Sequence, residues 1–131
     1  MIFLDTDIIS YYLAMDAKIK KKIFEAFDSD EDICITIINI YEVLRGFRWR
    51  ANKKKEGMFN EFLGYLYVFS LDDKAIDIAS SIYADLRKSG KTIEDTDILI
   101  AAITIRNDGV LVSNNTRHYE GIERLKMVNW V

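Results

Sequence analysis

The sequence predicts a three-layer α/β domain in which a central, mostly parallel β-sheet is flanked by helices. Short apolar runs alternate along the chain with longer segments in which apolar residues recur every three or four positions. Strands that alternate with helices pair in parallel and carry helices on both faces. The 131 residues include no proline and no Gly/Ser-rich linker, so we expect a single domain over residues 1–131.

Two strands and four helices are expected in the first half of the chain. Thr6, which follows an apolar run and Asp5, is a good N-cap for the first helix, and Thr36 has the same place before the third. The second helix is amphipathic, because its apolar residues recur every four positions. In chain order the elements are a strand at residues 2–4, helices that carry residues 8–13 and 18–27, a strand at 33–35, and helices that carry residues 40–47 and 59–66.

Three strands and two helices are expected in the second half. Asp72 or Asp73 opens the first of these helices, whose apolar side includes Ile76 and Tyr83, and Gly90 stops it. The second helix is the most apolar of the chain and covers residues 92–106. The strands are expected at residues 67–69, 110–112 and, at an edge of the sheet, 126–128.

The charge balance limits how this protein can hold nucleic acid. A net charge of −3 and a pI of about 5.2 argue against a protein that coats nucleic acid through bulk charge. Bound RNA would have to meet a local cationic surface, and basic residues are concentrated at positions 18–22 and 45–55. Such runs also occur on solvated helix faces. The residues that we expect to contact RNA are Arg45, Arg48, Lys53 and Lys54.

The N-terminus and the apolar segments favour a cytoplasmic protein. The first residues include no basic side chain and meet an acid at Asp5, unlike a signal peptide. The longest apolar stretches, residues 33–43 and 98–105, are shorter than the roughly 20 residues that a membrane helix needs. Cys34, the only cysteine, lies in an apolar run and is expected to be a small buried hydrophobe, which argues against thiol chemistry and disulfides.

Polar residues follow the first strand and the strand at 110–112. Asp5 stands directly after the first, and residues 113–116 follow the other with the sequence Ser-Asn-Asn-Thr. Because ligands gather at the carboxyl ends of parallel strands, we expect a site at this edge of the sheet. Asp5 can also serve as a cap for the helix that follows it.

Asp97 is the least expected charge in the sequence. It shares a helical face with Ile100, Ala101 and Thr104, and that face is otherwise apolar apart from the threonine. A carboxylate on a buried face costs several kcal/mol unless it is paired or bound to metal. Arg106 is more than two turns away, so the sequence leaves two explanations open, a metal ion or an unseen hydrogen-bonded partner.

Three further acids each have a functional and a structural explanation. Glu42 lies among apolar residues of its helix, but it can also form a surface ion pair with Arg45. Asp7 falls in a first helical turn, where an acid suits the helix dipole. Asp95 completes a Thr-x-x-Asp capping pattern at a helix start.

The candidate residues suit a hard cation and phosphodiester chemistry. The sequence contains no pattern for a zinc site, a Ser/His/Asp triad or a phosphate-binding glycine loop, and its only histidine is His118. Carboxylate and amide oxygens suit Mg²⁺ or Mn²⁺. Such ions activate water and offset negative charge on an attacked phosphate, so phosphodiester hydrolysis is the expected reaction.

Four segments, in order, resemble the motifs of the PIN-domain family and span nearly the whole chain. They are Leu4–Ser10, Ile37–Gly46, Asp97–Ala102 and Val110–Tyr119. The variant Asn-Asn-Thr followed by basic, His and aromatic residues, together with the terminal Asn129-Trp130, is similar to VapC toxins of toxin–antitoxin pairs. This resemblance implies a PIN-like fold and a Mg²⁺-dependent ribonuclease that forms a homodimer and is neutralised by a VapB-like antitoxin.

The resemblance also implies roles for individual residues. Asp5, Glu42 and Asp97 match the acidic core, with Asp5 and Asp97 as direct metal ligands. Two positions depart from the family pattern: Asp7 stands where asparagine is commoner, and the fourth segment has no acid. Asn115 is then the catalytic candidate as a neutral oxygen ligand, or Asp95 supplies the missing charge. The auxiliary candidates are Thr6, Asp7, Asp95 and His118.

Other functions remain open from the sequence. The chain could be a PIN nuclease of RNA processing that is not a toxin, or a catalytically weak RNA-binding module, since the fourth acid is missing. A receiver-like signalling domain also places acids at strand ends. That class leaves Glu42 without a role, and no lysine lies at a suitable final strand.

Overall fold

A five-stranded parallel sheet lies at the centre of the computed structural model, which describes residues 1–131. The strand order is β3-β2-β1-β4-β5, and every neighbouring pair is parallel. β1 is central, with Ile2 opposite Ile33 on one side and opposite Val110 on the other. The strands are β1 (Ile2–Leu4), β2 (Ile33–Thr36), β3 (Tyr67–Phe69), β4 (Val110–Val112) and β5 (Lys126–Val128).

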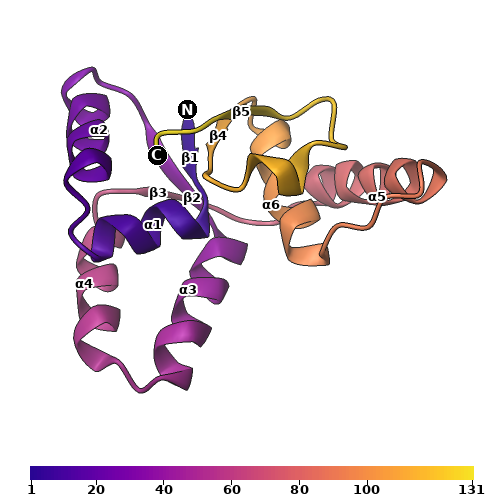
Figure 1. The fold of residues 1–131 in the computed structure, drawn as a ribbon. Coiled ribbons are helices and arrows are strands. Elements are labelled where there is room, and N and C mark those ends of the chain that lie inside the picture. The colour runs from indigo at the N-terminus through magenta and orange to yellow at the C-terminus, as the bar shows by residue number, and fades with distance from the viewer.

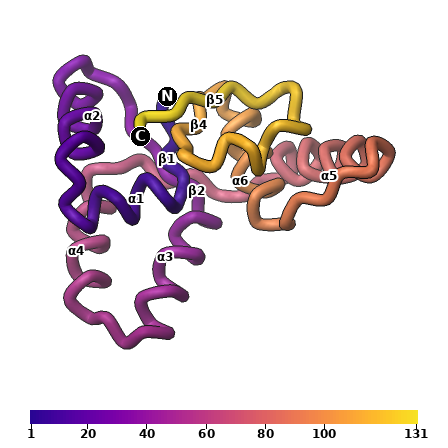
Figure 2. Tube along the Cα trace, viewed as in Figure 1, coloured from indigo at the N-terminus to yellow at the C-terminus, as the bar shows by residue number.

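Helices cover both faces of the sheet and complete the three layers that the sequence predicts (Figure 1). One group consists of α1 (Thr6–Leu13), α2 (Ala17–Asp28), α3 (Ile37–Trp49) and α4 (Lys53–Leu63). The other consists of α5 (Asp73–Lys88) and α6 (Asp95–Arg106), followed by the short 3-10 helix η1 (Thr116–Tyr119). The tube in Figure 2 follows α3 and α4 as a hairpin that extends away from the sheet.

Alternation of side chains along the strands divides the core in two. Phe3 packs in the cluster formed with α5 and α6, whereas its neighbour Leu4 packs in the cluster formed with α1 to α4. Cys34 and Ile35 divide in the same way, and Cys34 is fully buried with no disulfide, as predicted. The short strands are therefore covered on both faces, which leaves their carboxyl ends as the edge on which polar groups collect.

Helix starts follow the predicted capping residues at α3 and α5 and depart from them at α1 and α6. Thr36 and Asp72 cap α3 and α5 with side-chain oxygens that accept from backbone N–H groups. The prediction that Thr6 caps α1 is wrong. Asp5 is the cap, and its carboxylate accepts from the Thr6 N–H, so Thr6 is the first helical residue and its hydroxyl is free for another partner.

The helix α6 starts three residues later than predicted. Glu94 holds the N-cap position without a side-chain hydrogen bond, and residues 91–94 form a loop. The capping pattern that ends at Asp95 therefore does not form. Two residues of α5 also differ from prediction, since Ile76 and Tyr83 are each 46% exposed. No helix is long and apolar enough to cross a membrane.

Candidate active site

Asp5 is the centre of a buried hydrogen-bond network at the carboxyl edge of the sheet. Asp5 directly follows β1 and is only 6% exposed. One carboxylate oxygen accepts from the Thr6 N–H at 2.9 Å and from the Asn39 amide at 3.3 Å. The other accepts from the Ser113 hydroxyl at 2.8 Å and from the Tyr119 hydroxyl at 3.0 Å. Together these four donors fix the orientation of the Asp5 carboxylate.

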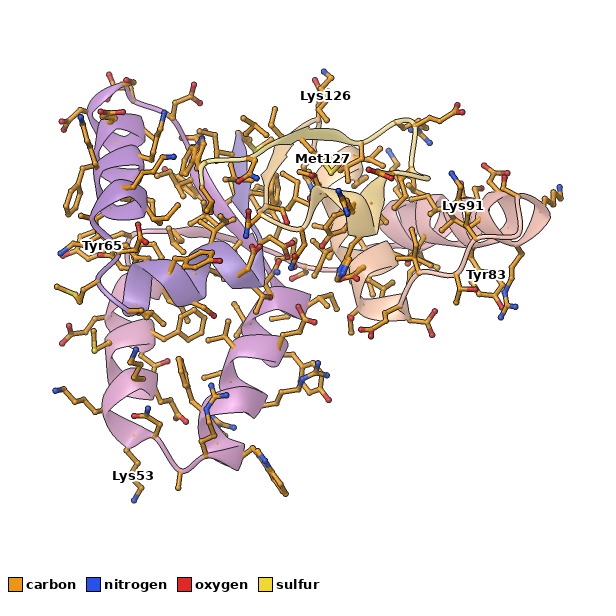
Figure 3. The ribbon with its side chains drawn as sticks, viewed as in Figure 1. Lys53, Tyr65, Tyr83, Lys91, Lys126 and Met127 are labelled. Carbon is orange, nitrogen blue, oxygen red and sulfur yellow. The ribbon has the colours of Figure 1, made fainter.

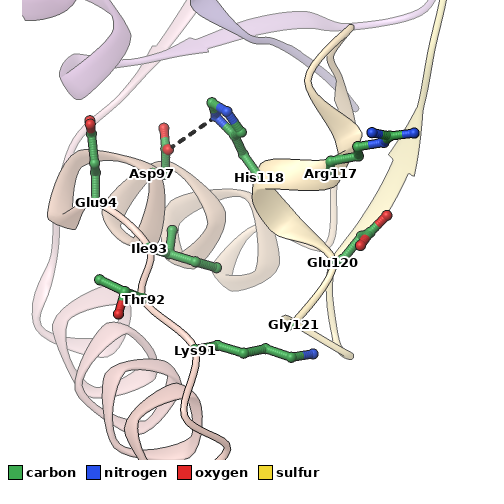
Figure 4. Close-up of a pocket in the computed structure, with 9 residues that line it drawn as sticks. All are labelled: Lys91, Thr92, Ile93, Glu94, Asp97, Arg117, His118, Glu120 and Gly121. Carbon is green, nitrogen blue, oxygen red and sulfur yellow. Dashed lines mark ion pairs between the residues drawn. The ribbon is translucent and has the colours of Figure 1, made fainter.

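Asp97 faces the same tyrosine from the opposite side. The Tyr119 hydroxyl lies 3.4 Å from Asp97 Oδ1 and 3.0 Å from the Asp5 carboxylate, so it bridges the two acids. The pKa of Asp97 is raised to about 6, chiefly by burial and also by the charges of Asp5 and Glu42, while His118 acts in the opposite direction. The His118 Nδ1 lies 3.7 Å from Asp97 Oδ2 (Figure 4). The structure therefore brings Asp5, Asp97 and His118 together, which sequence spacing alone cannot show.

Glu42 joins this network through the hydroxyl of the first helical residue. Thr6 Oγ1 donates to Glu42 at 2.7 Å and accepts from the Asn39 amide at 3.0 Å. Arg45 lies 3.7 Å from the other Glu42 oxygen, so the ion pair considered from the sequence also forms. The Glu42 side chain is only 14% exposed, whereas that of Arg45 is 51% exposed. Glu42 therefore belongs to the site, and Arg45 lies at its rim.

Asp7 holds the loop after β4 against the helix α1. Its carboxylate accepts from the Asn114 N–H at 2.9 Å and from the Ile8 N–H at 2.8 Å. The pKa of Asp7 is raised to about 6, chiefly by burial and also by the charge of Asp5, while the backbone donors act in the opposite direction. Asp7 therefore positions the loop, a role that goes beyond the helix-dipole explanation considered from the sequence.

The predicted fourth ligand is not assembled in the site. Asn115 is exposed and reaches the network only through its backbone N–H, which donates to the Ser113 hydroxyl at 2.9 Å. Asp95 is exposed and lines, with Ile98, a surface hollow between α5 and α6. Glu94, which sequence reasoning missed, is the additional acid whose charge raises the pKa of Asp97.

Three uncharged residues of the network were not among the candidate site residues, although Ser113 belongs to the segment expected at this edge of the sheet. Tyr119, Ser113 and Asn39 are each at most 1% exposed, and each donates a hydrogen bond to Asp5. A signal existed for Asn39, because it is a polar residue three positions after the capping Thr36 in an otherwise apolar helix start. No pattern in the sequence distinguishes the Tyr119 hydroxyl from an ordinary aromatic core residue.

The predicted RNA-binding residues lie at two different distances from the acids. Arg45 is one helical turn from Glu42 and so borders the site. Arg48 pairs with Glu56 at 3.3 Å and is 67% exposed. Figure 3 places Lys53 at the far end of the α3–α4 hairpin, so the remainder of this cluster extends away from the acids.

A cavity of about 400 Å³ opens on the other side of Asp97. Its walls are the loop at residues 91–94, the start of α6, and residues 117–121 (Figure 4). Asp97 and His118 belong both to this cavity and to the acidic network. The acids therefore lie between the basic face of α3 and a separate polar cavity.

The donor set fits a hard divalent cation in its chemistry, although no three acidic, His or Cys side chains form a ready-made metal cluster. Asp5, Glu42 and Asp97 lie near enough for Asp5 and Glu42 to raise the pKa of Asp97. No Lys or Arg side chain pairs with Asp5 or Asp97, so their charge lacks a strong cationic partner. Oxygen ligands and unbalanced negative charge are what Mg²⁺ and Mn²⁺ require.

Known proteins resemble this chain over almost its whole length. A family model described as PIN domain matches residues 2–123. Ribonuclease VapC2 of Haemophilus influenzae is 29% identical over 130 residues, which cover 98% of this chain and 96% of that protein. Ribonuclease VapC1 of Methanocaldococcus jannaschii is 29% identical over 122 residues, or 93% of this chain and 81% of that protein. A chain of VapBC2 from Rickettsia felis, solved with promoter DNA, has a TM-score of 0.91 at 24% identity over the full length of both chains. This last likeness establishes the fold.

Proposed function

The chain belongs to the PIN-domain family, and we propose that it is the toxic endoribonuclease of a type II toxin–antitoxin pair. It would hydrolyse RNA phosphodiester bonds at the acidic edge of the sheet with Mg²⁺ or Mn²⁺. The observation that carries this proposal is the pair of carboxylates, Asp5 and Asp97, joined by the Tyr119 hydroxyl and lacking a Lys or Arg partner. The relatives that are named ribonucleases cover nearly all of the chain and support it.

In this proposal the two carboxylates hold the cation, which activates water and offsets charge on the attacked phosphate when bound. Thr6 orients Glu42 through a short hydrogen bond, so that its carboxylate faces the same site. His118 lies beside Asp97 and can donate to the carboxylate or to a phosphate oxygen. Arg45, at the rim, is placed to contact the RNA backbone.

The proposal includes a small VapB-like antitoxin as partner. Solved neighbours include VapBC of Rickettsia felis and Salmonella typhimurium, and one similar structure is a toxin–antitoxin complex from Klebsiella pneumoniae. An acidic pocket can be blocked by an arginine side chain, which forms charge-assisted hydrogen bonds with carboxylates.

We also expect the protein to form a homodimer. A monomer at micromolar concentration in light scattering would count against this expectation.

One feature favours a second candidate, a PIN module that binds RNA with weak catalysis. The fourth acid of the family pattern is absent, and Asn115 lies outside the carboxylate network except for its backbone N–H. A non-toxin nuclease of RNA processing shares the proposed chemistry, and a neighbouring small antitoxin gene would separate the two.

Expression in a bacterial host with and without the neighbouring small gene tests the toxin proposal. The wild type should arrest growth and leave discrete cut ends in total RNA, and the small gene should restore growth. Asp97→Asn, expressed at the same protein level, should neither arrest growth nor leave cut ends in the RNA. Normal growth with intact RNA in cells that contain folded wild-type protein would contradict the proposal, and RNA binding without cut ends would favour the weakly catalytic module.

A further inference from the structure

We propose that the cavity beside Asp97 binds one unpaired nucleotide of the RNA next to the cleaved phosphate, and that Glu94 selects its base. This inference rests on the proposed ribonuclease function, because it assigns the cavity to the same substrate. Three features of the cavity carry it: its position, its size, and the mixed charge of its walls.

The position of the cavity connects it to the acids. Asp97 and His118 form part of its wall, and His118 lies 3.7 Å from the Asp97 carboxylate. A phosphate held at the acids therefore places a neighbouring nucleotide either along α3, towards Arg45, or into this cavity. Figure 4 shows Ile93 between His118 and Lys91, with Glu94 and Asp97 pointing to the same side.

The size of the cavity suits a single nucleotide. Its volume of about 400 Å³ falls within the range of small-ligand sites, about 300 to 1,000 Å³. A paired duplex cannot enter a hollow of this size, so the RNA must be single-stranded there. Sequence-specific proteins commonly read RNA in this form, with the base splayed out and stacked on a ring such as histidine.

The walls supply the groups that an RNA nucleotide needs. Lys91 and Arg117 provide positive charge for a phosphate, and Ile93 and His118 provide an apolar surface and a ring for the base. Glu94 holds the N-cap position of α6 without capping it, and its carboxylate has no salt bridge or hydrogen bond. It is therefore free to accept from an amino group on the base.

A carboxylate acceptor distinguishes the four bases. Cytosine, adenine and guanine carry an exocyclic amino group that donates, whereas uracil has only carbonyl oxygens at its exocyclic positions and donates only from the ring N3–H. A carboxylate placed at the exocyclic group meets a donor in the first three bases and an acceptor in uracil. Glu94 should therefore disfavour uracil at one position beside the cut. Glutamine at this position can both donate and accept, so Glu94→Gln should weaken that discrimination and leave the fold intact.

The test uses the full-length protein with Mg²⁺ and a single-stranded RNA oligonucleotide pool that is randomised around one site. Sequenced cut ends should show that uracil is depleted at one flanking position for the wild type and not for Glu94→Gln. Lys91→Ala should raise KM by about tenfold, the equivalent of one charged hydrogen bond, with kcat within about twofold. Matched controls are Lys88→Ala and Glu123→Gln, two exposed residues outside the cavity, which should match the wild type.

A binding readout separates this inference from the proposed function. Adenosine, cytidine and guanosine monophosphates, each titrated into the protein, should shift the NMR amide signals of residues 91–94 and 117–121, and uridine monophosphate should need a higher concentration for the same shifts. RNA cleavage with no such shifts, and with base preference unchanged in Glu94→Gln, would overturn the nucleotide site and leave the ribonuclease standing. Nucleotide binding at the cavity without RNA cleavage would support the site and refute the ribonuclease.

Discussion

Exchange of Asp97 for asparagine is expected to stabilise the metal-free protein while it abolishes cleavage. The Asp97 side chain is only 17% exposed, and burial together with nearby acids raises its pKa from 3.8 to about 6. In the folded protein the ionised form is therefore disfavoured. The resulting loss of stability is absent below pH 3.8, grows between pH 3.8 and 6, and is complete above pH 6.

The size of this effect follows from the pKa. At about 1.4 kcal/mol per pH unit, a rise from 3.8 to about 6 amounts to about 3 kcal/mol. Asparagine keeps the volume and an acceptor oxygen for Tyr119, but it loses the attraction of His118. We therefore expect Asp97→Asn to raise the free energy of unfolding by about 1 to 3 kcal/mol at pH 7.5 and by much less at pH 4.5.

Chemical denaturation of both proteins at these two pH values, with EDTA and with Mg²⁺, measures the effect. Mg²⁺ should stabilise the wild type more than the mutant, because a ligand that binds only the folded state stabilises it more when it binds more tightly. The contrary result is a mutant that is less stable at pH 7.5 and keeps the full Mg²⁺ effect. Asp97 would then be a structural hydrogen-bond acceptor, whose loss costs about 1 to 3 kcal/mol.

Three other variants test the acidic site and the basic cluster beyond it. Tyr119→Phe removes the hydroxyl that two carboxylates share, so denaturation in EDTA should show a free energy of unfolding lower by about 1 to 3 kcal/mol. Mg²⁺ should restore more stability to this variant than it adds to the wild type. Unchanged stability would show that these hydrogen bonds contribute nothing. Replacement of Arg48, Lys53 and Lys54 by alanine should weaken RNA binding and flatten its salt dependence, and an unchanged slope would make this cluster ordinary solvated surface. The pKa of Asp7 is raised to about 6, so its ionised form destabilises the fold at higher pH. In thermal melts, Asp7→Asn should be more stable than the wild type above pH 6 and equal to it near pH 4. Destabilisation at every pH would show that the backbone hydrogen bonds of Asp7 contribute more than its charge costs.

The strands and the acids of the site could be predicted because their signals are local. Asp5 follows a buried strand, and Asp97 and Glu42 interrupt apolar helical faces, so each stands out from its own neighbours. The parallel order of the sheet then brings the ends of β1 and β4 to one edge. These inferences need only periodicity and the rule that ligands gather at strand ends.

The remaining features depend on tertiary contacts. The Tyr119 hydroxyl meets Asp5 across 114 positions of the chain, and nothing near it in sequence marks this contact. The capping pattern at Asp95 was misleading, because α6 begins at that residue and leaves the preceding loop to line a cavity. Tyr83 and Ile76 fit an apolar helical face by spacing, yet α5 packs only a narrower stripe against the core.

Cleavage of a labelled single-stranded RNA by the purified protein tests the central claim most directly. The wild type should cut in Mg²⁺ or Mn²⁺, stop in EDTA and recover when excess Mg²⁺ is restored, whereas Asp5→Asn and Asp97→Asn should remain inactive throughout although folded. Undiminished cleavage by the wild type in EDTA, or normal cleavage by folded Asp97→Asn, would contradict the assignment of a metal-dependent ribonuclease site to these carboxylates.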